Sequence, residues 1–384
     1  MVTLFDVARL AGVSTATVSR VVHGQDRVRE ATRIRVQQAI EELGYVPDGA
    51  AQSLSRRRKD VIGLVCVERQ AQQYDIENMN LLFYDEVLRG VESRIRNHDW
   101  SLLITFLQGA HDPSYARIES FTGKVDGILI GEGIVPSPFI ERLATRVPVV
   151  IFAGTPHEQA VDVVTADNLS GSAAVVTHLI RDHGKRRLFW VHGPADSPDS
   201  RERRYGLDYV LRASPQCELT GFYEGYYSVE SGEKAGESLL AMPRRELPDA
   251  VVSANDQMAI GLLRALARAG VRVPQDVAVV GFDDIFPGSL CEPPLTTVYQ
   301  PMRMLGERAC ARLLERIANP GLRPATELLP AELVLRSSCG CPPGTVIRQP
   351  VPTLKVARSE LTAATPLPTS PQPGRRPARQ AAKA

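Results

Sequence analysis

The N-terminal segment of the chain has the periodicity of an amphipathic helix. The first apolar positions recur at i, i+3, i+4 and i+7 after a capping Thr3, which is the spacing of one helix face: Leu4, Val7, Ala8 and Ala11. Gly12 and Val13 break this period, and Ser14 is a good N-cap for a second helix over 15–22. The inward-facing residues of that helix are Val18, Val21 and Val22. Two helices joined by so tight a turn cross steeply, which indicates a helix-turn-helix whose second helix can enter a DNA major groove.

A third helix is predicted over 30–43, where Gly44 ends it. Its expected apolar face consists of Ile34, Ala39, Ile40 and Leu43. Pro47 and Asp48 then start a short helix over 49–56, which runs into a basic stretch over 56–59. Two helical turns are not stable alone, so we expect this segment to fold when DNA supplies counter-charge and a groove.

From residue 61 the pattern changes to short apolar strands that alternate with helices. In the first half the expected strands are 61–67, 101–106, 125–130 and 148–152, with helices over 83–97 and 115–122. In the second half the strands are 188–192, 218–222, 250–253 and 277–282, with helices over 170–182, 201–212, 231–242 and 256–269. This alternation predicts two α/β subdomains with doubly wound parallel sheets, and a ligand cleft at the carboxyl ends of their strands.

Composition agrees with a multidomain chain. Its 384 residues suggest two to three domains, and no run of about 18 apolar residues is present. The N-terminus is a polar helix rather than an apolar signal segment, so we expect a cytoplasmic protein without a membrane partner. The six cysteines are interpreted as small buried residues. Cys339-x-Cys341 is close-set, but no second Cys or His pair lies nearby in the sequence, so we expect no metal site.

Charge is distributed unevenly. The net charge of +1 divides into +3 for residues 1–60, +6 for 342–384 and −8 for the remainder, so only the ends attract phosphate. Residues 342–384 are rich in proline and hold no aromatic residue, and we interpret them as a disordered tail. The expected organisation is a headpiece over 1–46, a hinge helix and basic linker over 47–60, a two-lobed body over 61–341, and this tail.

The headpiece motifs resemble those of the lac repressor (LacI/GalR) family of bacterial transcription regulators. The matching segments are Thr3-Leu-Phe-Asp-Val-Ala8, Ala11-Gly-Val-Ser14, Ala16-Thr-Val-Ser-Arg-Val-Val22, Gly44-Tyr45, Pro47 and Ala51-Gln-Ser-Leu54. His23 stands where the family usually has Asn, and Arg29 where a Ser usually caps the third helix. The resemblance implies a homodimer on a pseudo-palindromic double-stranded operator, with Leu54 wedged into the minor groove.

Several headpiece and linker residues are therefore candidates for DNA contact. Arg20 lies one turn beyond the start of the second helix, where an arginine can bond bidentately to guanine. Ser14 and Thr17 are expected to act as helix caps as well, and Arg57 and Arg58 could belong to an ordinary solvated linker. The candidate DNA-binding residues are Ser14, Thr15, Ala16, Thr17, Arg20, Ala51, Leu54, Arg57 and Arg58.

The body resembles the same family, whose fold is shared with periplasmic sugar-binding proteins. Close matches are Ser253-Ala-Asn-Asp-Gln-Met-Ala-Ile-Gly261, Val279-Val-Gly-Phe-Asp-Asp284 and Pro293-Pro-Leu-Thr-Thr-Val298. The resemblance implies that Arg203, Asn255, Asp283 and Gln300 contact a small-molecule effector. It also aligns Phe83, Tyr84 and Tyr227 with aromatic walls of the effector site.

Those four polar residues mix donors and acceptors in the way that the vicinal hydroxyls of a sugar require. Each candidate has a structural alternative. Asp283 could cap the next turn, Arg203 lies in a charged stretch over 201–204 that could be solvated, and an isolated aromatic residue is often core.

These patterns bear on three classes of function. We expect a ligand-controlled transcriptional repressor, whereas a sugar-binding transport component would need a signal segment. An enzyme or a cofactor is not expected, because no phosphate-cradling loop or nucleophile and base set is evident. His178, His183 and His192 are interpreted as surface or core residues. A nucleobase is the main competitor to a sugar, but the family's nucleobase sensors carry an Arg and a Thr where this chain has Ser197-Pro-Asp-Ser200.

Overall fold

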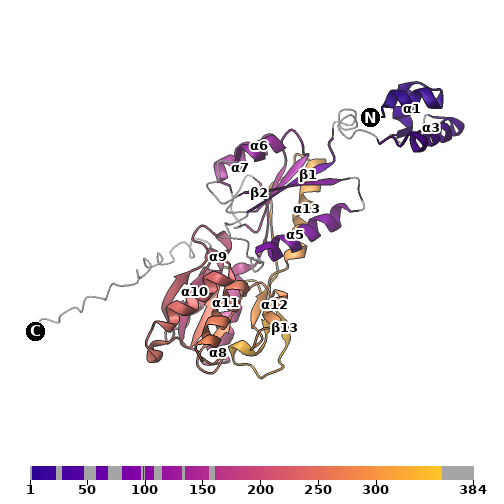
Figure 1. Cartoon of the computed structure of the whole chain (residues 1–384). Helices are drawn as coiled ribbons and strands as arrows, with labels where there is room; N and C mark the ends of the chain where they lie inside the picture. The colour runs from indigo at the N-terminus through magenta and orange to yellow at the C-terminus, as the bar shows by residue number, and fades with distance from the viewer. Residues whose placement is uncertain are drawn as a thin grey trace, which may run out of the picture. The chain divides into compact units, whose positions relative to one another are not determined.

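The computed structural model describes residues 2–22, 28–46, 58–67, 80–96, 98, 100–107, 115–131, 135–154 and 161–356. A helical headpiece and a larger α/β body are two separate units of the chain (Figure 1). The predicted hinge helix over 49–56 lies outside the described residues, and with it Ala51, Leu54 and the adjacent Arg57. Among the described residues, none of the helices combines the length and the apolar character that a membrane span requires.

The headpiece consists of three helices with the expected limits, α1 (Leu4–Ala11), α2 (Thr15–Val22) and α3 (Glu30–Leu43). Thr3 and Asp6 form a capping box at the start of α1, because each side chain accepts a hydrogen bond from the backbone N–H of the other. Gly44, with a φ of 59°, ends α3, while Arg29 at its start provides no side-chain cap. The limits of these helices therefore follow from local sequence.

One expectation about the headpiece core was wrong. Ile34 was expected on the apolar face of α3 but is 46% exposed, whereas Val36 is fully buried. At about 100° per residue, the two side chains are separated by about 200° around the helix, so both cannot face the core. The face that packs on α1 and α2 starts at Val36 and continues through Ala39, Ile40 and Leu43, which again is the i, i+3, i+4, i+7 spacing.

This difference predicts unequal effects for two substitutions in one helix. Val36→Ala should lower the free energy of unfolding of the headpiece by ~1–2 kcal/mol, because it leaves a cavity among α1, α2 and α3. Ile34→Ala should change it by less than ~0.5 kcal/mol, because its side chain is largely in solvent. Thermal unfolding of the two variants tests this, and equal losses would mean that both positions are core.

The first lobe of the body is built on a six-stranded sheet with the order β11-β5-β4-β3-β1-β2. Its strands are β1 (Val61–Val67), β2 (Ser101–Leu107), β3 (Gly127–Gly131), β4 (Val149–Phe152), β5 (Asp162–Ala166) and β11 (Thr326–Leu329). The central pairings, β1 with β3, β3 with β4, and β4 with β5, are parallel. Helices α5 (Asn80–Ile95) and α13 (Met302–Ala318) lie on one side, and α6 (Tyr115–Phe121) and α7 (Ser137–Ala144) on the other (Figure 1).

Helix α13 and strand β11, which the sequence pattern did not predict, come from late in the chain and complete the first lobe. Helix α13 packs closely on α5 because glycines meet at the crossing. A Cβ on Gly90 would lie 2.0 Å from the carbonyl oxygen of Arg303, and one on Gly306 would lie 2.1 Å from that of Val87. The fully buried carboxylate of Asp162 in β5 accepts a hydrogen bond from Arg312 Nε at 2.9 Å, which fixes α13 along the sheet.

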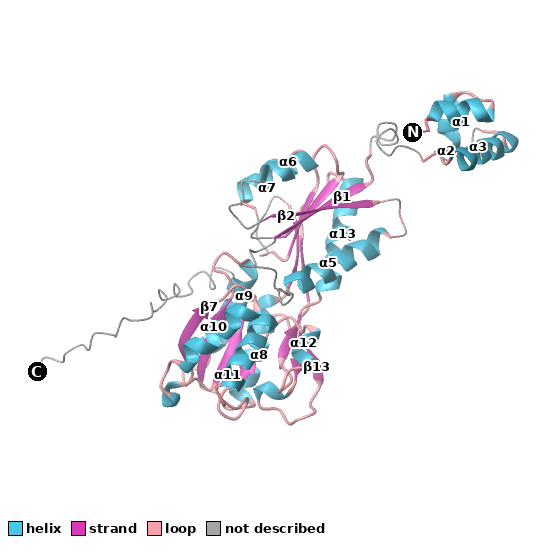
Figure 2. Cartoon of the chain, viewed as in Figure 1, coloured by secondary structure: helices cyan, strands magenta, loops and turns pink. Residues whose placement is uncertain are grey.

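The second lobe has a parallel four-stranded sheet with the order β7-β6-β8-β9. Figure 2 shows its strands, in magenta, among the cyan helices of this lobe. Its strands are β6 (Arg187–His192), β7 (Glu218–Glu224), β8 (Ala250–Ser253) and β9 (Ala278–Val280). Helices α8 (Asn168–Arg181) and α9 (Pro198–Arg212) pack together, as do α10 (Val229–Leu240) and α11 (Asp256–Arg268), and a short α12 spans Phe286–Ser289. Both lobes thus have the doubly wound α/β architecture that the alternating pattern predicted.

The predicted disorder of residues 342–384 was wrong for 342–356. Strands β10 (Thr297–Tyr299), β12 (Glu332–Leu335) and β13 (Ile347–Pro350) form an antiparallel sheet, in which β13 pairs with β12. Val351 is buried, and the backbone N–H of Leu354 donates to Ser170 Oγ at 2.9 Å. The proline-rich composition of this segment suggested disorder, but a single edge pairing and a few apolar contacts suffice to order it. Residues 357–384 lie outside the described residues.

The chain passes between the lobes three times. The crossings are β5 to α8, β10 to α13, and β11 to β12. The carboxyl ends of β8 and β9 and the start of α9 therefore lie next to these crossings, which is where a cleft between two α/β lobes opens.

Candidate effector cleft and DNA-reading surface

A cleft in the body is lined by every residue that was predicted from the sequence to bind the effector. Its volume is about 110 Å³, whereas a single water needs only ~10–15 Å³. The lining includes Phe83, Tyr84, Arg203, Tyr227, Asn255, Asp283 and Gln300. Further lining residues were not predicted from the sequence, among them Leu82, Phe152, Ser197, Asp199, Gln257 and Met302.

Arg203 occupies the centre of the hydrogen-bond network in this cleft. Its Nε donates to Asn168 Oδ1 at 2.8 Å, and its two terminal nitrogens donate to the carbonyl oxygen of Ala254 at 2.6 Å and to Gln300 Oε1 at 2.7 Å. The guanidinium also lies 3.8 Å from the centroid of the Phe282 ring. Arg203 is only 3% exposed, so it does not belong to a solvated charged face. It joins α8, α9, the end of β8 and the segment after β10.

Asp283 directly faces this arginine. Its Oδ1 lies 3.4 Å from a terminal nitrogen of Arg203, and its backbone has a φ of 123°, in the region that side-chain-bearing residues avoid. The alternative that Asp283 caps the next turn does not hold, because no side chain caps the start of α12. The carboxylate is therefore held in an unfavourable backbone conformation and presented to the cleft.

Burial keeps this carboxylate partly protonated near neutral pH. Desolvation raises the pKa of Asp283 to about 7. The neighbouring carboxylate of Asp199 raises it as well, and Arg203 opposes both effects. Burial also raises the pKa of Asp199, which accepts a hydrogen bond from Asn168 Nδ2 at 2.9 Å. Perturbed acids of this kind, gathered in a cleft, are typical of a functional site.

Two polar atoms that line the cleft could form hydrogen bonds with a ligand. Gln300 Nε2 and Gln257 Oε1 are buried and have no hydrogen-bond partner among the described residues. Gln300 Oε1 already accepts from Arg203, so its amide group is oriented with Nε2 left over. A buried polar atom without a partner costs ~1–3 kcal/mol, which a ligand that offers one acceptor and one donor would recover.

Asn255 and the aromatic residues have structural as well as lining roles. Asn255 caps α11, because its Oδ1 accepts from the backbone N–H of Met258 at 3.0 Å, while its Nδ2 donates to the carbonyl oxygen of Tyr227 at 3.4 Å. Phe83 and Tyr84 form an edge-to-face pair with ring centroids 5.3 Å apart. The hydroxyl of Tyr227 lies 2.8 Å from Ser197 Oγ. Apolar ring faces and polar groups thus line the same cleft.

The raised pKa of Asp283 predicts pH-dependent effector binding. A carboxylate that accepts two hydroxyl protons must be ionised, so ligand affinity should fall by up to tenfold per pH unit below about pH 7 and level off above it. Folding has the opposite dependence: the raised pKa favours the protonated form of the folded protein, and this stabilisation is lost as pH rises through about 7. Calorimetry across this range tests the binding, and Asp283→Asn should bind weakly at every pH. A pH-independent affinity in the unmodified protein would contradict this role.

In the headpiece, the candidate DNA-binding residues of the second helix lie together on α2. Ser14 caps this helix, because its Oγ accepts from the backbone N–H of Thr17 at 3.2 Å, and the two hydroxyls lie 2.9 Å apart. Thr15 is half-buried, whereas Ala16 and Arg20 are exposed and follow each other by one helical turn. Arg58, at the start of the described linker, is half-exposed and lies 3.9 Å from Asp60. The exposed face of α2 is therefore available to a groove.

Comparisons with known proteins agree with both units. Residues 3–48 match the model of bacterial regulatory proteins of the lacI family, and residues 176–339 match that of a periplasmic binding protein-like domain. The ribose operon repressor of Escherichia coli (strain K12) is 36% identical over 328 residues, which is 84% of this chain and 95% of the repressor. The regulator CelR of Thermobifida fusca is 34% identical over 88% of this chain and 98% of its own length.

Comparison with solved structures also shows similarity to regulators of the lacI family. The lac repressor dimer bound to operator and the anti-inducer ONPF superposes with a TM-score of 0.77 at 29% identity, covering 88% of this chain and 99% of that one. The CelR–cellobiose complex gives a TM-score of 0.63 at 33% identity, with 88% and 100% covered. With a helix-turn-helix headpiece, a two-lobed α/β body, and relatives that match almost from end to end, this chain belongs to the lacI family of bacterial regulatory proteins.

Proposed function

We propose that this protein is a transcriptional repressor that binds a pseudo-palindromic double-stranded operator as a homodimer and is controlled by a sugar bound between its lobes. The observation that carries the proposal is the convergence in one cleft of Arg203, Asp283, Gln300 and three aromatic side chains. The solved lac repressor is a dimer on operator DNA, which supports the same assembly for this chain. Operator DNA as the partner implies a cytoplasmic protein.

The chemistry of the cleft favours a sugar over a nucleobase. The carboxylates of Asp199 and Asp283 accept hydrogen bonds, Gln300 Nε2 donates one, and Tyr84 and Tyr227 add apolar ring faces. Rows of hydroxyls satisfy such a mixture of acceptors and donors. The first turn of α9, where the nucleobase-sensing pattern would place an Arg and a Thr, starts with Ser197, whose hydroxyl caps the helix and contacts Tyr227. A ribose operon repressor and a cellobiose-bound regulator among the relatives support this choice.

The body also contains a serine beside a histidine, which could suggest a hydrolase. Ser200 Oγ lies 3.0 Å from His192 Nδ1, and the backbone N–H of Gly193 donates to the same Oγ at 2.9 Å. Both side chains are buried, at 0% and 2% exposed, and neither lines the cleft. No substrate can reach this serine, so we interpret the pair as a structural link between β6 and α9. The proposed function is binding and regulation without turnover.

Thermal unfolding of the full chain with candidate effectors tests the proposal. Ribose, other pentoses, hexoses, cellobiose, adenine and hypoxanthine would be added separately. A ligand at about 100 times its Kd should stabilise the native state by ~2.7 kcal/mol. We expect one sugar to raise the midpoint and to alter operator binding in a fluorescence anisotropy titration. Stabilisation by a purine and by none of the sugars would overturn the sugar assignment, and chemical conversion of the ligand would overturn the non-enzymatic one.

A further inference from the structure

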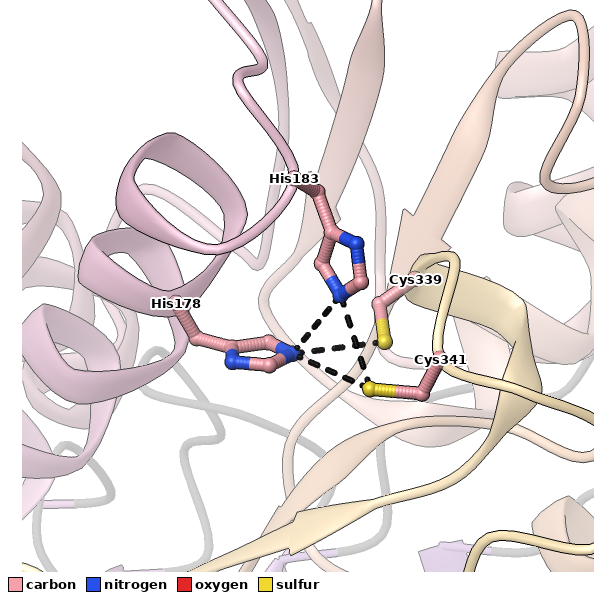
Figure 3. Close-up of side chains that lie close together, drawn as sticks. All are labelled: His178, His183, Cys339 and Cys341. Carbon is pink, nitrogen blue, oxygen red and sulfur yellow. Dashed lines mark hydrogen bonds between the residues drawn. The ribbon is translucent and has the colours of Figure 1, made fainter.

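Four side chains of types that can bind a metal, from two segments distant in sequence, meet on the second lobe, away from the cleft. His178 lies in the last turn of α8 and His183 just beyond that helix. Cys339 ends a short 3₁₀ helix over Ser337–Cys339, and Cys341 follows two residues later. Figure 3 shows both imidazoles and both thiols pointing toward one centre. One ligand atom from each of the four residues lies within 4.8 Å of the other three. The expectation of no metal site was wrong in its premise that no histidine pair lies near the cysteines. In the folded chain His178 lies next to Cys339, although 161 residues separate them in the sequence.

Four of the six distances between these atoms fit the edges of a tetrahedron around a metal ion, and the other two lie within 4.8 Å. The two Nε2 atoms are 3.1 Å apart. Cys339 Sγ lies 3.5 Å from His178 Nε2, and Cys341 Sγ lies 3.5 Å from the Nε2 of each histidine. For zinc bonded to nitrogen at ~2.0–2.1 Å and to sulfur at ~2.3 Å, tetrahedral angles give edges of about 3.3 Å between nitrogens and about 3.6 Å between nitrogen and sulfur.

Hydrogen bonds alone do not account for the cluster. His178 Nδ1 lies 2.6 Å from Asp182 Oδ2, and a carboxylate at this distance accepts the ring proton. This tautomer leaves Nε2 with one lone pair, yet Nε2 faces His183 and both sulfurs. One lone pair cannot serve three partners. The Cys339 sulfur has further partners in Thr296 Oγ1 at 3.2 Å and the carbonyl oxygen of Arg336 at 3.3 Å, but these leave the contacts of His178 Nε2 unexplained, whereas a cation in the middle would satisfy all four atoms. A carboxylate on the far side of a ligating imidazole is also the usual support of a zinc-bound histidine.

Burial and backbone geometry favour a closed site. Cys339 is fully buried and His178 is 7% exposed, while His183 and Cys341 are half-buried. Gly340 between the cysteines has a φ of 119°, and a Cβ on it would lie 2.9 Å from His183 Nδ1. A glycine is therefore required for both sulfurs to turn toward the histidines. Four protein ligands leave no open position for a substrate, which is the arrangement of structural zinc rather than catalytic zinc.

We propose that His178, His183, Cys339 and Cys341 bind one Zn²⁺ in a structural site. Two thiolates and two neutral imidazoles favour zinc over magnesium or calcium, which prefer oxygen, and the two thiolates neutralise the charge of the ion. The site fastens the segment after β12 to the C-terminal end of α8. The opposite end of α8 supplies Asn168, which holds Arg203 in the cleft. Zinc thereby stabilises both the ordered C-terminal segment and the helix that frames the effector site.

Metal content is the direct test. Full-length protein purified without an affinity tag should contain one zinc per chain by elemental mass spectrometry. Cys341→Ser and His183→Asn should each reduce this to below about a tenth, because three ligands hold the ion much more weakly than four. Cys217→Ser and His98→Asn are matched controls, since these residues are exposed or half-exposed outside the cluster, and they should retain the metal.

Cobalt substitution gives a readout that needs no variant. Protein stripped with a chelator and reloaded with Co²⁺ should show the intense visible bands of a tetrahedral site and a thiolate-to-cobalt charge-transfer band, and zinc should displace both. Stripping should also lower the midpoint of thermal unfolding, with recovery on addition of zinc. The proposal fails if the stripped protein takes up neither metal. It also fails if mass spectrometry of freshly trapped protein shows a disulfide between Cys339 and Cys341.

Discussion

Replacing Arg203 with alanine is expected to destabilise the body by ~3–5 kcal/mol and to abolish effector binding, because each buried acceptor left without its donor costs ~1–3 kcal/mol. Three acceptors lose their donor: Asn168 Oδ1, Gln300 Oε1 and the carbonyl oxygen of Ala254. Asp283 also loses the cation that lowers its pKa, so its carboxyl group would be protonated more of the time. Urea unfolding measures the loss of stability, and calorimetry with the identified effector measures the loss of binding.

Arg212→Ala is the matched control, since this arginine ends the same helix and is exposed. It should change stability by less than ~0.5 kcal/mol. If Arg203→Ala unfolds at the same urea concentration as the control, Arg203 is not the centre of the cleft network. If it is unstable yet binds the effector normally, the arginine has a structural role only.

Replacing Arg20 with alanine should weaken binding to a selected operator by ~1–3 kcal/mol, roughly 5- to 150-fold, with a much smaller effect on unrelated DNA. Arg20 is exposed on α2, one turn beyond Ala16, where a side chain can reach the edge of a base. An operator selected from random DNA with the purified protein supplies the matched site. Fluorescence anisotropy on both DNAs then separates base reading from phosphate contact.

Arg58→Ala provides the contrast. We propose a phosphate contact for this residue, so its loss should weaken binding to every sequence equally and reduce the salt dependence. Arg20→Ala should leave the salt dependence closer to that of the unmodified protein. Equal losses on operator and unrelated DNA for Arg20→Ala would reduce its role to phosphate binding.

Sequence reasoning succeeded where local signals determine the structure. The limits of α3 follow from periodicity up to Leu43 and from a glycine that adopts a positive φ at Gly44. It failed for Ile34 because apolar character alone does not decide which side of a helix faces the core. It also missed α13, a charged helix whose burial depends on partners far away, namely Gly90 in α5 and Asp162 in β5.

In the cleft, too, some residues could be predicted from the sequence and others could not. The family resemblance named seven lining residues, because their motifs are short and stand at the ends of strands or the starts of helices. Asp199 and Gln257 lie inside two of the segments compared with the family, 197–200 and 253–261, but they were not assigned to the cleft, since an acid in the first turn of α9 and a glutamine in the first turn of α11 are ordinary surface residues by pattern. Likewise, the distance in sequence between His178 and Cys339 concealed a cluster that exists only after folding.

The three crossings between the lobes determine when each part of the molecule can form during synthesis. Asp162 in β5 accepts the backbone N–H of Ala325, 163 residues later, so the first lobe lacks its edge strand and a covering helix until almost the whole described body has been made. The headpiece core, in contrast, is complete by Tyr45. At ~5–20 residues per second, the ribosome needs roughly 15–60 s for the residues in between. During that interval the nascent chain carries the complete headpiece core without an effector cleft, so a chain released early would keep the DNA-reading helix but could not respond to sugar.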